Sequence, residues 1–494
     1  MTRRKLALAA LVVLALAGVA LARPGGGESF SGGHSSSGGG GGGGGGIVFL
    51  IELIYYLFIL FVDFPLVAFP LLIIVVFLIW RSSRQNRLNK HDWNSGAAAT
   101  LASPAPVAES LGELRAIDPD FSQIVFEDFA FRLFSTAQRA RADSQALAAV
   151  APYVSDRART ELAQRAAAGA VQQVVVGSLR VENVKVPSPV ADDSFVQIVV
   201  SYEANVATAE HTYYSVESWW FKRAANRHSK PPSAAHTFPC PNCGAPWKAA
   251  AMGTQVCSNC GQTVDNGRFD WVVDSLSVEE IDERPPTVTQ EVAERGTDLP
   301  TVQTSDLSDR MGELSTADPN VTEASLEARL TTIYGELNRA WSDNNLAPAR
   351  PFVSDALYDY LQYWIDTYKR QTLRNQLTNM RITRSMLAKV ERDKWYDAVT
   401  IRLWGTGLDY VINTDSGRVL RGSKHSERPY SEYWTLIRAA GKQGKPQTSA
   451  TCNNCGAPLR ITMGGDCEHC GAHVTSGEFD WVLSKIEQDD TYNG

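Results

Sequence analysis

The chain has 494 residues, 44% apolar and 20% charged, a globular composition long enough for two or three domains. Its formal net charge of −7 argues against general binding to nucleic acid or to anionic membrane surfaces. All eight cysteines lie in C-x-x-C pairs, so none is left for a disulfide framework of the secreted kind. This usage indicates metal binding in a reducing compartment.

The first 22 residues have the features of a signal peptide. Basic residues in MTRRK precede the apolar run LALAALVVLALAGVA, and ALA stands directly before Arg23 as a small-residue cleavage sequence. An uncleaved signal anchor is the alternative. Residues 23–46 follow as a Gly/Ser-rich tether, which cannot bury a hydrophobic core and is expected to be a flexible coil.

A long apolar run over residues 47–80 predicts a transmembrane segment. As one straight helix it would extend about 51 Å, beyond a hydrocarbon core of about 30 Å. Pro65 and Pro70 therefore divide it, either into an interfacial piece and one span or into a hairpin. Four basic residues follow within the linker predicted over 81–111. A single crossing then places the soluble domains in the cytoplasm, tethered to the inner membrane of the cell.

The rest of the chain carries an internal repeat with a period near 200 residues. GELRAIDPDFS matches GELSTADPNVT, PYVSD matches PFVSD, ESWWFKRAA matches EYWTLIRAA, and GRFDWVV matches GEFDWVL. The matching pairs occur in the same order in both copies, together with the cysteine pairs. We therefore predict one domain over 112–281 and a second over 309–494, joined by a Pro/Thr/Asp-rich linker over 282–308.

Each copy has the pattern of helices followed by strands. Apolar residues recur at helical spacing from Leu326 to Trp341, and Ser155 and Ser354 are placed to cap a second helix. Alternation with a period of two then begins, and FDWV opens the last strand. This order predicts an α+β fold with helices on one face of a curved, mostly antiparallel sheet.

A cysteine segment is inserted between the third and fourth predicted strands of each copy, over 238–264 and 450–474. Glycine follows the second cysteine of every pair, which suits a metal-binding knuckle because glycine adopts a positive φ without steric penalty. Four thiolates in a closed tetrahedron form a structural zinc site. We predict two structural Zn²⁺ ions, one in each zinc ribbon. The predicted ligands are Cys240, Cys243, Cys257 and Cys260 in the first copy and Cys452, Cys455, Cys467 and Cys470 in the second.

Two other chemistries use the same residue type. A thioredoxin-like redox pair needs a helix N-terminus after a strand, whereas Pro and Gly crowd these pairs. An iron–sulfur cluster also takes four thiolates, and the sequence excludes it only weakly. His469 and His473 could replace a cysteine as ligands, but four cysteines already fill the coordination shell.

The tether RPGGGESFSGG, the membrane stretch DFPLVAFPLLII and the FDWV strands together resemble bacterial membrane proteins with Tim44-like domains. The family is named for a subunit of the mitochondrial inner-membrane import translocase. The resemblance covers nearly the whole chain. It implies a nuclear transport factor 2-like fold with a concave apolar pocket, membrane association, and a part in protein translocation or complex assembly. The duplication and the zinc ribbons depart from the mitochondrial pattern.

The sequence therefore predicts a membrane-tethered binding or scaffold protein, and not an enzyme, with a protein or lipid partner. A pocket enzyme of the same fold is the first alternative, and it would need a carboxylate or histidine with a tuned pKa. Asp270, Asp480, Glu217 and Glu432 are the candidates, although acidic residues beside tryptophan on a strand are expected to cap loops or face solvent. His211 has no counterpart in the second copy.

Nucleic-acid binding through the zinc ribbons is the second alternative. Basic residues precede each cysteine segment, and in the first copy they follow Trp219 and Trp220. Such an arrangement could bind phosphates through the basic side chains and bases through the aromatic rings. These residues are Lys222, Arg223, Arg227 and Lys230 in the first copy and Arg438, Lys442 and Lys445 in the second. A solvated strand end is the interpretation that the acidic net charge favours.

Overall fold

The computed structural model describes residues 104–494 with internal gaps. The gaps are 166–168, 192, 233–237, 251–252, 284–296, 445–450, 453–454, 458–466, 468, 471–476, 478–479, 490–491 and 493. The predicted signal peptide, tether and transmembrane segment, residues 1–80, lie outside the described residues. None of the described helices combines the length and apolar character needed to cross a bilayer.

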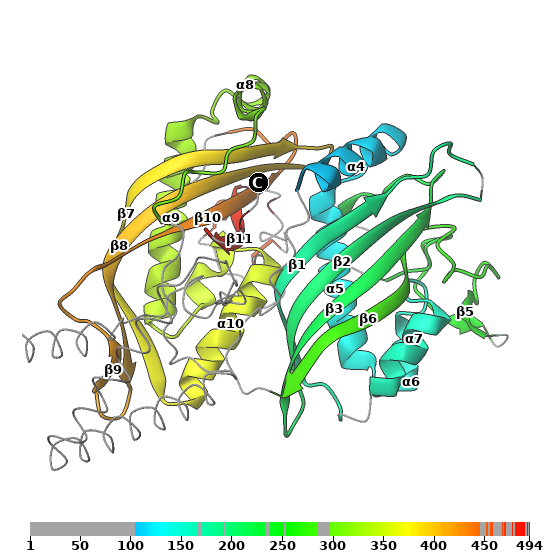
Figure 1. Cartoon of the computed structure of the whole chain (residues 1–494), viewed down its shortest axis with the longest axis horizontal. Helices are drawn as coiled ribbons and strands as arrows, with labels where there is room; N and C mark the ends of the chain where they lie inside the picture. The colour runs from blue at the N-terminus through cyan, green and yellow to red at the C-terminus, as the bar shows by residue number, and fades with distance from the viewer. Residues whose placement is uncertain are drawn as a thin grey trace, which may run out of the picture.

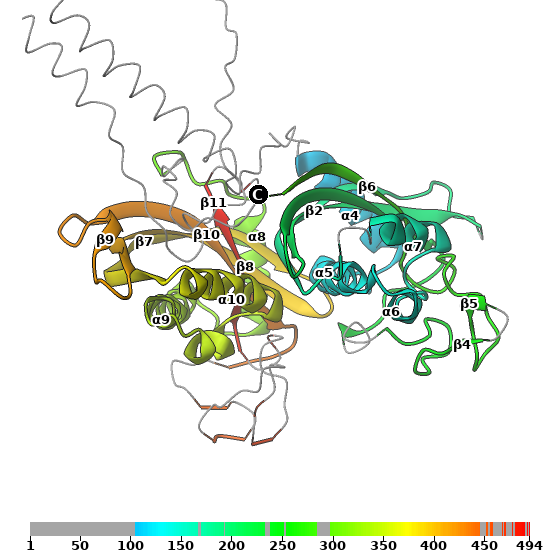
Figure 2. The same cartoon turned by 90° about the horizontal axis from the view of Figure 1, so that it is seen from below.

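The N-terminal half, residues 104–283, packs helices against one antiparallel sheet. Its strands occur in the order β1-β2-β3-β6. Figure 2 shows this sheet arching over α5, so the core lies between the sheet and the helices. The helices are α4 (Pro104–Ile117), α5 (Gln123–Ala140), α6 (Ser144–Ala149) and α7 (Asp156–Ala163), and the strands are β1 (Gln173–Lys185), β2 (Phe195–Ala207), β3 (Thr212–Ala224) and β6 (Val272–Glu283).

The C-terminal half, residues 297–494, has the same order of helices and sheet strands. Its strands are arranged β11-β10-β8-β7, and β9 (Val419–Gly422) pairs with β8 at the far end of the long β7–β8 hairpin (Figure 1). The predicted mixture of helices and antiparallel sheet is confirmed. The other elements are α8 (Leu307–Ala317), α9 (Glu323–Ser342), η3 (Ala347–Phe352), α10 (Asp355–Arg370), β7 (Leu373–Arg392), β8 (Tyr396–Asn413), β10 (Arg428–Ala439) and β11 (Val482–Gln488).

The predicted helix signals have the expected physical effect. Ser155 Oγ accepts a hydrogen bond from the third residue of α7, and Ser354 Oγ does the same for α10, so both residues are N-caps. On α9 the apolar residues from Leu326 to Trp341 fall on the buried face. In α10 the corresponding stripe includes Leu361 and Tyr368. These stripes form the helix side of the C-terminal core.

Helix α4 begins at Pro104, within the stretch 81–111 that the sequence suggested was a linker. Proline is tolerated in the first turn of a helix because the N–H that it lacks has no partner there. Leu111 and Leu114 of α4 are buried in the N-terminal core. The helical packing unit therefore starts before the first repeated marker.

The repeated sequence markers meet in space at one end of the N-terminal sheet. Asp118, from the IDPD marker, is fully buried and its Oδ2 lies 2.6 Å from Arg223 Nη2 at the end of β3. The Arg223 guanidinium lies over the Trp271 ring, 4.5 Å from its centroid. Ser229 also donates to the Asp118 carboxylate from its backbone N–H at 3.0 Å. The turn after α4, the end of β3 and the start of β6 are thus joined.

The C-terminal half repeats this cluster. Asp318 Oδ2 lies 3.0 Å from Arg438 Nη1, and the Arg438 guanidinium lies 4.7 Å from the centroid of Trp481. Here Gly444 supplies the backbone N–H, at 3.0 Å from Asp318 Oδ2. The same three side-chain types therefore make the same contacts in both halves.

The VSD markers are tied to the last strand of each sheet. The Ser155 N–H donates to Val273 O at 2.9 Å, and the Ser354 N–H donates to Leu483 O at 2.8 Å. Each bond belongs to a short parallel bridge at the start of the second predicted helix. The sequence repeats these motifs because each copy uses them to fasten the helices to the end of its sheet.

The two halves lie side by side and contact each other (Figure 1). Lys485 Nζ lies 2.6 Å from Glu127 Oε2, and Arg132 Nη2 lies 2.9 Å from Asp355 Oδ2. Residues of β3 also join the apolar core of the C-terminal half. The halves therefore share an interface that contains both ion pairs and apolar packing.

Candidate metal centres

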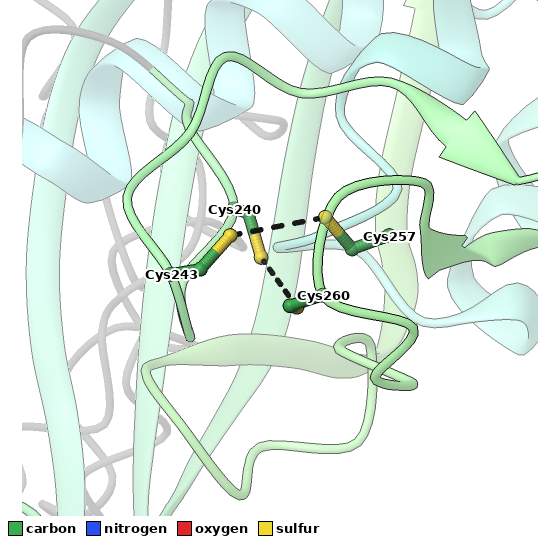
Figure 3. A group of neighbouring side chains, drawn as sticks. All are labelled: Cys240, Cys243, Cys257 and Cys260. Carbon is green, nitrogen blue, oxygen red and sulfur yellow. Dashed lines mark hydrogen bonds between the residues drawn. The ribbon is translucent and has the colours of Figure 1, made fainter.

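The first cysteine segment folds into a group of four thiols (Figure 3). Cys240 Sγ lies 3.8 Å from Cys260 Sγ, and Cys243 Sγ lies 3.9 Å from Cys257 Sγ. All four sulfur atoms lie within 4.8 Å of one another, so the group could hold a metal ion. The segment lies between β3 and β6 and contains the short hairpin of β4 (Ala249–Ala250) and β5 (Gly253–Cys257).

The sulfur separations fit one tetrahedral ion. A Zn–S bond of about 2.3 Å places the corners of a tetrahedron about 3.8 Å apart, close to the observed distances. A disulfide would require about 2.05 Å, and all eight cysteines are free. In an iron–sulfur cluster the thiolates bind different iron atoms, an arrangement that spreads the sulfurs more widely than a single ion does.

Two backbone knuckles build the first group. Gly244 has a φ of 72°, and its N–H donates to Cys240 O at 2.8 Å. Gly261 has a φ of 68° and makes the same bond to Cys257 O at 2.9 Å. A side chain at either glycine would be strained because L-residues avoid this region. The sequence prediction that glycine turns the chain back at each pair is confirmed here.

Two asparagines complete the environment of the first group. Asn242 Nδ2 lies 3.4 Å from Cys260 Sγ, and Asn259 Nδ2 lies 3.5 Å from Cys243 Sγ, so each knuckle donates to a thiol of the other. Hydrogen bonds from Asn259, and next from the Ala245 backbone, lower the pKa of the Cys243 thiol to about 6. Neither asparagine was predicted as part of the site from the sequence, although both stand directly before the second cysteine of a pair.

The first group is fixed to the helical side of its half. Trp247 Nε1 donates to Ala148 O in α6 at 2.8 Å, and Tyr153 OH donates to Pro239 O at 3.0 Å. Burial of the phenol raises the pKa of Tyr153 well above its usual value. The first cysteine segment is therefore packed against its half through these two hydrogen bonds, and is not an independent appendage.

The second cysteine segment lies between β10 and β11. Its described residues repeat the close group of four thiols and the first glycine knuckle. Cys452 Sγ lies 3.8 Å from Cys470 Sγ, and all four sulfurs again lie within 4.8 Å. Gly456 has a φ of 73°, and its N–H donates to Cys452 O at 2.7 Å. Gly471 lies outside the described residues. The structure thus brings all eight predicted ligands together in two groups of four.

The aspartates considered as catalytic candidates form ion pairs. Asp270 Oδ2 lies 2.8 Å from Lys230 Nζ, and Asp480 Oδ2 lies 3.3 Å from Arg329 Nη1. The other oxygen of each carboxylate accepts the backbone N–H of the following tryptophan. Both residues therefore cap the turn that leads into the last strand of the sheet.

The two glutamates do not face solvent, and the sequence expectation for them was wrong. Glu217 and Glu432 are 2% and 1% exposed. Trp219 Nε1 donates to Glu217 Oε2 at 2.9 Å, and Trp434 Nε1 donates to Glu432 Oε2 at 2.9 Å. Residues i and i+2 of a strand share a face, so each glutamate is carried into the core beside the indole that bonds to it.

The basic residues before the cysteine segments do not form a free basic strip in the described residues. Arg223 and Arg438 are buried in the ion pairs with Asp118 and Asp318, where a solvated strand end was expected. Lys222 Nζ lies 2.5 Å from Oδ1 of Asp274 in β6. Trp219 is also fully buried. Lys445 lies outside the described residues. The geometry thus removes the principal side chains on which the nucleic-acid hypothesis was based.

These features define an α+β protein with two cysteine-based candidate metal centres. Residues 308–447 match the family model of the Tim44-like domain, so the C-terminal half contains a region that resembles this domain. No curated protein matches the chain. Among solved structures, an "Ntf2 like protein involved in plasmid conjugation" is similar at 9% identity and a TM-score of 0.16, over 73% of this chain and 93% of that chain.

Proposed function

We propose that the chain is a membrane-tethered binding or scaffold protein with two tandem Tim44-like domains, each carrying a structural zinc ribbon. The family match supports this assignment for residues 308–447. For the N-terminal half the support is the same strand order and the same buried Asp–Arg–Trp cluster. The partner is a protein or a lipid, and the role is linked to translocation or to assembly of a membrane complex.

Zinc is the metal that suits the two thiol groups best. Four cysteines supply a closed, soft donor set, and their separations fit a single tetrahedral ion. In each half the ion would be held by the four named cysteines. Segments this short bury too little apolar surface to fold without such support. The zinc therefore acts as a structural support in this proposal and has no catalytic role.

The observation that carries the binding role is the place of the two metal centres. Each lies on an insertion at the same point of its sheet, between the third strand and the last. The chain thus presents two cysteine segments, each with a candidate metal centre, from the same place in two similar frames. The candidate carboxylates support a non-enzymatic reading, because Asp270, Asp480 and Glu217 are each held in structural contacts.

The membrane tether is proposed from the sequence over residues 1–80. The apolar run 47–80 and the basic residues that follow it favour one crossing with the two halves in the cytoplasm. Eight free cysteines are consistent with a reducing compartment. A reporter that is active only in the cytoplasm should therefore be active when it is fused to the C-terminus of the full chain. A reporter that is active only outside the cytoplasm should be inactive at the same position.

The binding role is tested by photocrosslinking in native membranes. A crosslinking amino acid is placed at the exposed Ser258 beside the first centre, and in a matched strain at the exposed Arg418 on the β8–β9 turn. We expect a discrete protein or lipid adduct from Ser258 that is absent from Arg418. Recovery of no specific adduct from Ser258 would contradict the scaffold proposal. Purified chain should carry two zinc ions, and a content far below two would contradict the metal assignment.

A further inference from the structure

A buried polar cluster lies inside the N-terminal half, between α5 and β3. Gln138 Nε2 donates to Glu217 Oε1 at 2.9 Å, and Arg165 Nη1 lies 2.9 Å from Glu217 Oε2. Arg141 Nη1 donates to Gln138 Oε1 at 3.0 Å. The resemblance to Tim44-like proteins implied an apolar pocket, whereas this interior contains two guanidinium groups and a carboxylate.

The charges in this cluster do not balance. Arg141 is 4% exposed and Glu217 is 2% exposed, and the Arg165 side chain is 18% exposed. Arginine stays protonated in proteins, so two positive charges face one negative charge. Burial lowers the pKa of Arg141; Glu217 opposes this shift, and the neighbouring Arg165 adds to it. A buried charge without a counter-charge is costly.

Two buried polar side-chain atoms in this part of the N-terminal half also lack a hydrogen-bond partner in the portion of the chain that the structure describes. Among the described residues, Arg141 Nε has no hydrogen-bond partner, and neither has Ser215 Oγ. Ser215 is 2% exposed and stands two residues before Glu217 on β3, so both side chains belong to the same face of the strand. An N–H of Arg141 and the Ser215 hydroxyl are therefore both buried without a described partner, the hydroxyl on the face of β3 that also carries Glu217.

The C-terminal half has tryptophan at both arginine positions. Counted from the Asp-Pro marker, Arg141 corresponds to Trp341, and counted from the VSD marker, Arg165 corresponds to Trp364. Both tryptophans are fully buried in the C-terminal core. Two indoles thus occupy positions where the N-terminal half has two guanidinium groups, which indicates that the fold itself does not need charge there.

We propose that the N-terminal half binds a singly charged oxyanion, a carboxylate or phosphate group of a small molecule or lipid, between Arg141, Arg165 and Ser215. Guanidinium groups bind carboxylates and phosphates through paired N–H donors, and the anion would supply the missing negative charge. The inference rests on the proposed binding role and names the ligand class of one half. The C-terminal half, with Trp341 and Trp364, has no equivalent site.

The test is calorimetric titration of the purified full chain at constant ionic strength with three probes. Acetate and inorganic phosphate represent free anions, and dihexanoylphosphatidylglycerol represents a lipid headgroup. We expect saturable binding of at least one probe, with one site per chain. Arg141→Gln should weaken it at least tenfold, whereas Arg418→Gln, on an exposed turn, should not change it. The probe that binds most tightly identifies the source of the anion.

Glu217→Gln separates a ligand site from a structural cluster. This change removes the carboxylate that competes for the guanidinium groups and keeps an oxygen that can accept from Trp219. Anion binding should tighten severalfold, even if Arg141→Gln fails to fold. The absence of saturable binding to the unaltered chain, or unchanged or weaker binding in Glu217→Gln, would overturn the proposal. Crosslinking at Ser258 reports on the partner separately, so failure of one proposal can be distinguished from failure of the other.

Discussion

The two halves of the chain have the same frame but different interiors. In both, a buried aspartate–arginine pair under a tryptophan joins the turn before the long helix to the end of the sheet. Between the long helix and the sheet, the N-terminal half has Arg141 and Arg165 where the C-terminal half has Trp341 and Trp364. The frame is therefore specified at the end of the sheet, which leaves the interior free to differ in chemistry.

The two cysteine groups give a second comparison between the halves. In both, a knuckle built on a glycine with positive φ follows the third strand of the sheet. Asparagines from the two knuckles donate to opposite thiols in the first centre, whereas the second centre has His469 at the position of Asn259. The local backbone thus determines the thiol arrangement, and the neighbouring side chains vary around it.

The largest expected effect is loss of one metal centre. Cys257→Ser and Cys467→Ser each remove a buried thiol from one group, and each should lower the zinc content from two ions to one. Binding at such sites is worth about 10–16 kcal/mol in isolated peptides, so the affected segment should unfold locally. Metal analysis with hydrogen exchange of the segment measures this. Ser258→Ala, beside Cys257 in the second knuckle of the first group, is the control, and two retained ions in either cysteine variant would contradict the assignment.

The next largest effect tests whether the shared frame is equally important in both halves. Arg223→Met and Arg438→Met each leave a buried aspartate without its arginine counter-charge. Each should lower the free energy of unfolding of its half by about 3–5 kcal/mol. Urea denaturation, with hydrogen exchange to assign the half, gives the measurement. As a control, Arg418→Met at an exposed position should change stability by less than about 0.5 kcal/mol. A large loss of stability in only one half would contradict the idea that the ion pair is equally important in both halves.

Acid sensitivity follows from the same pairs. Burial raises the pKa of Asp118, but Arg223 and the hydrogen bonds from Ser229 outweigh it, so the pKa is lowered. The pKa of Asp318 is lowered in the same way, with burial opposed by Asn320, Arg438 and Gly444. A depressed folded pKa gives stability that is present above the unfolded value of about 3.9 and is lost as the pH falls through the folded pKa.

Asp118→Asn and Asp318→Asn should therefore each flatten the loss of stability over the acid range below about pH 4. The measurement is a series of urea denaturation curves across that range. Asp415→Asn, at an exposed turn, is the control and should keep the full acid dependence. If both frame variants kept the slope of the unaltered chain, the two ion pairs would not be the source of its acid sensitivity.

The smallest expected effect concerns the docking of the first metal centre. Trp247→Phe removes the N–H that donates to Ala148 O and should lower the free energy of unfolding by about 0.5–1.5 kcal/mol. Differential scanning calorimetry gives this change while metal analysis should still show two ions. Trp220→Phe, half-buried on β3, is the matched control. Loss of zinc in Trp247→Phe would mean that docking and metal binding are coupled.

Local pattern was enough to predict the element order, the helix caps and the two cysteine groups. Ser155 and Ser354 cap helices, and glycines with positive φ follow the first pair of each group. These features depend on residues within one turn or one knuckle of each other, so short-range sequence spacing determines them. Helix α4 was not predicted because the sequence around Pro104 has the composition of a linker. Only the tertiary structure shows that Leu111 and Leu114 pack into the N-terminal core.

The sequence by itself thus determined the repeat and its local elements, and it predicts the tether and membrane segment over residues 1–80. Only the tertiary structure showed that Arg223 pairs with Asp118 and that Glu217 lies in the core with Gln138 and Arg165. Each of these contacts joins residues far apart in the chain. The physical reason is that a charged side chain has the same local pattern whether it is solvated or buried, and its fate depends on the partner that folding brings to it.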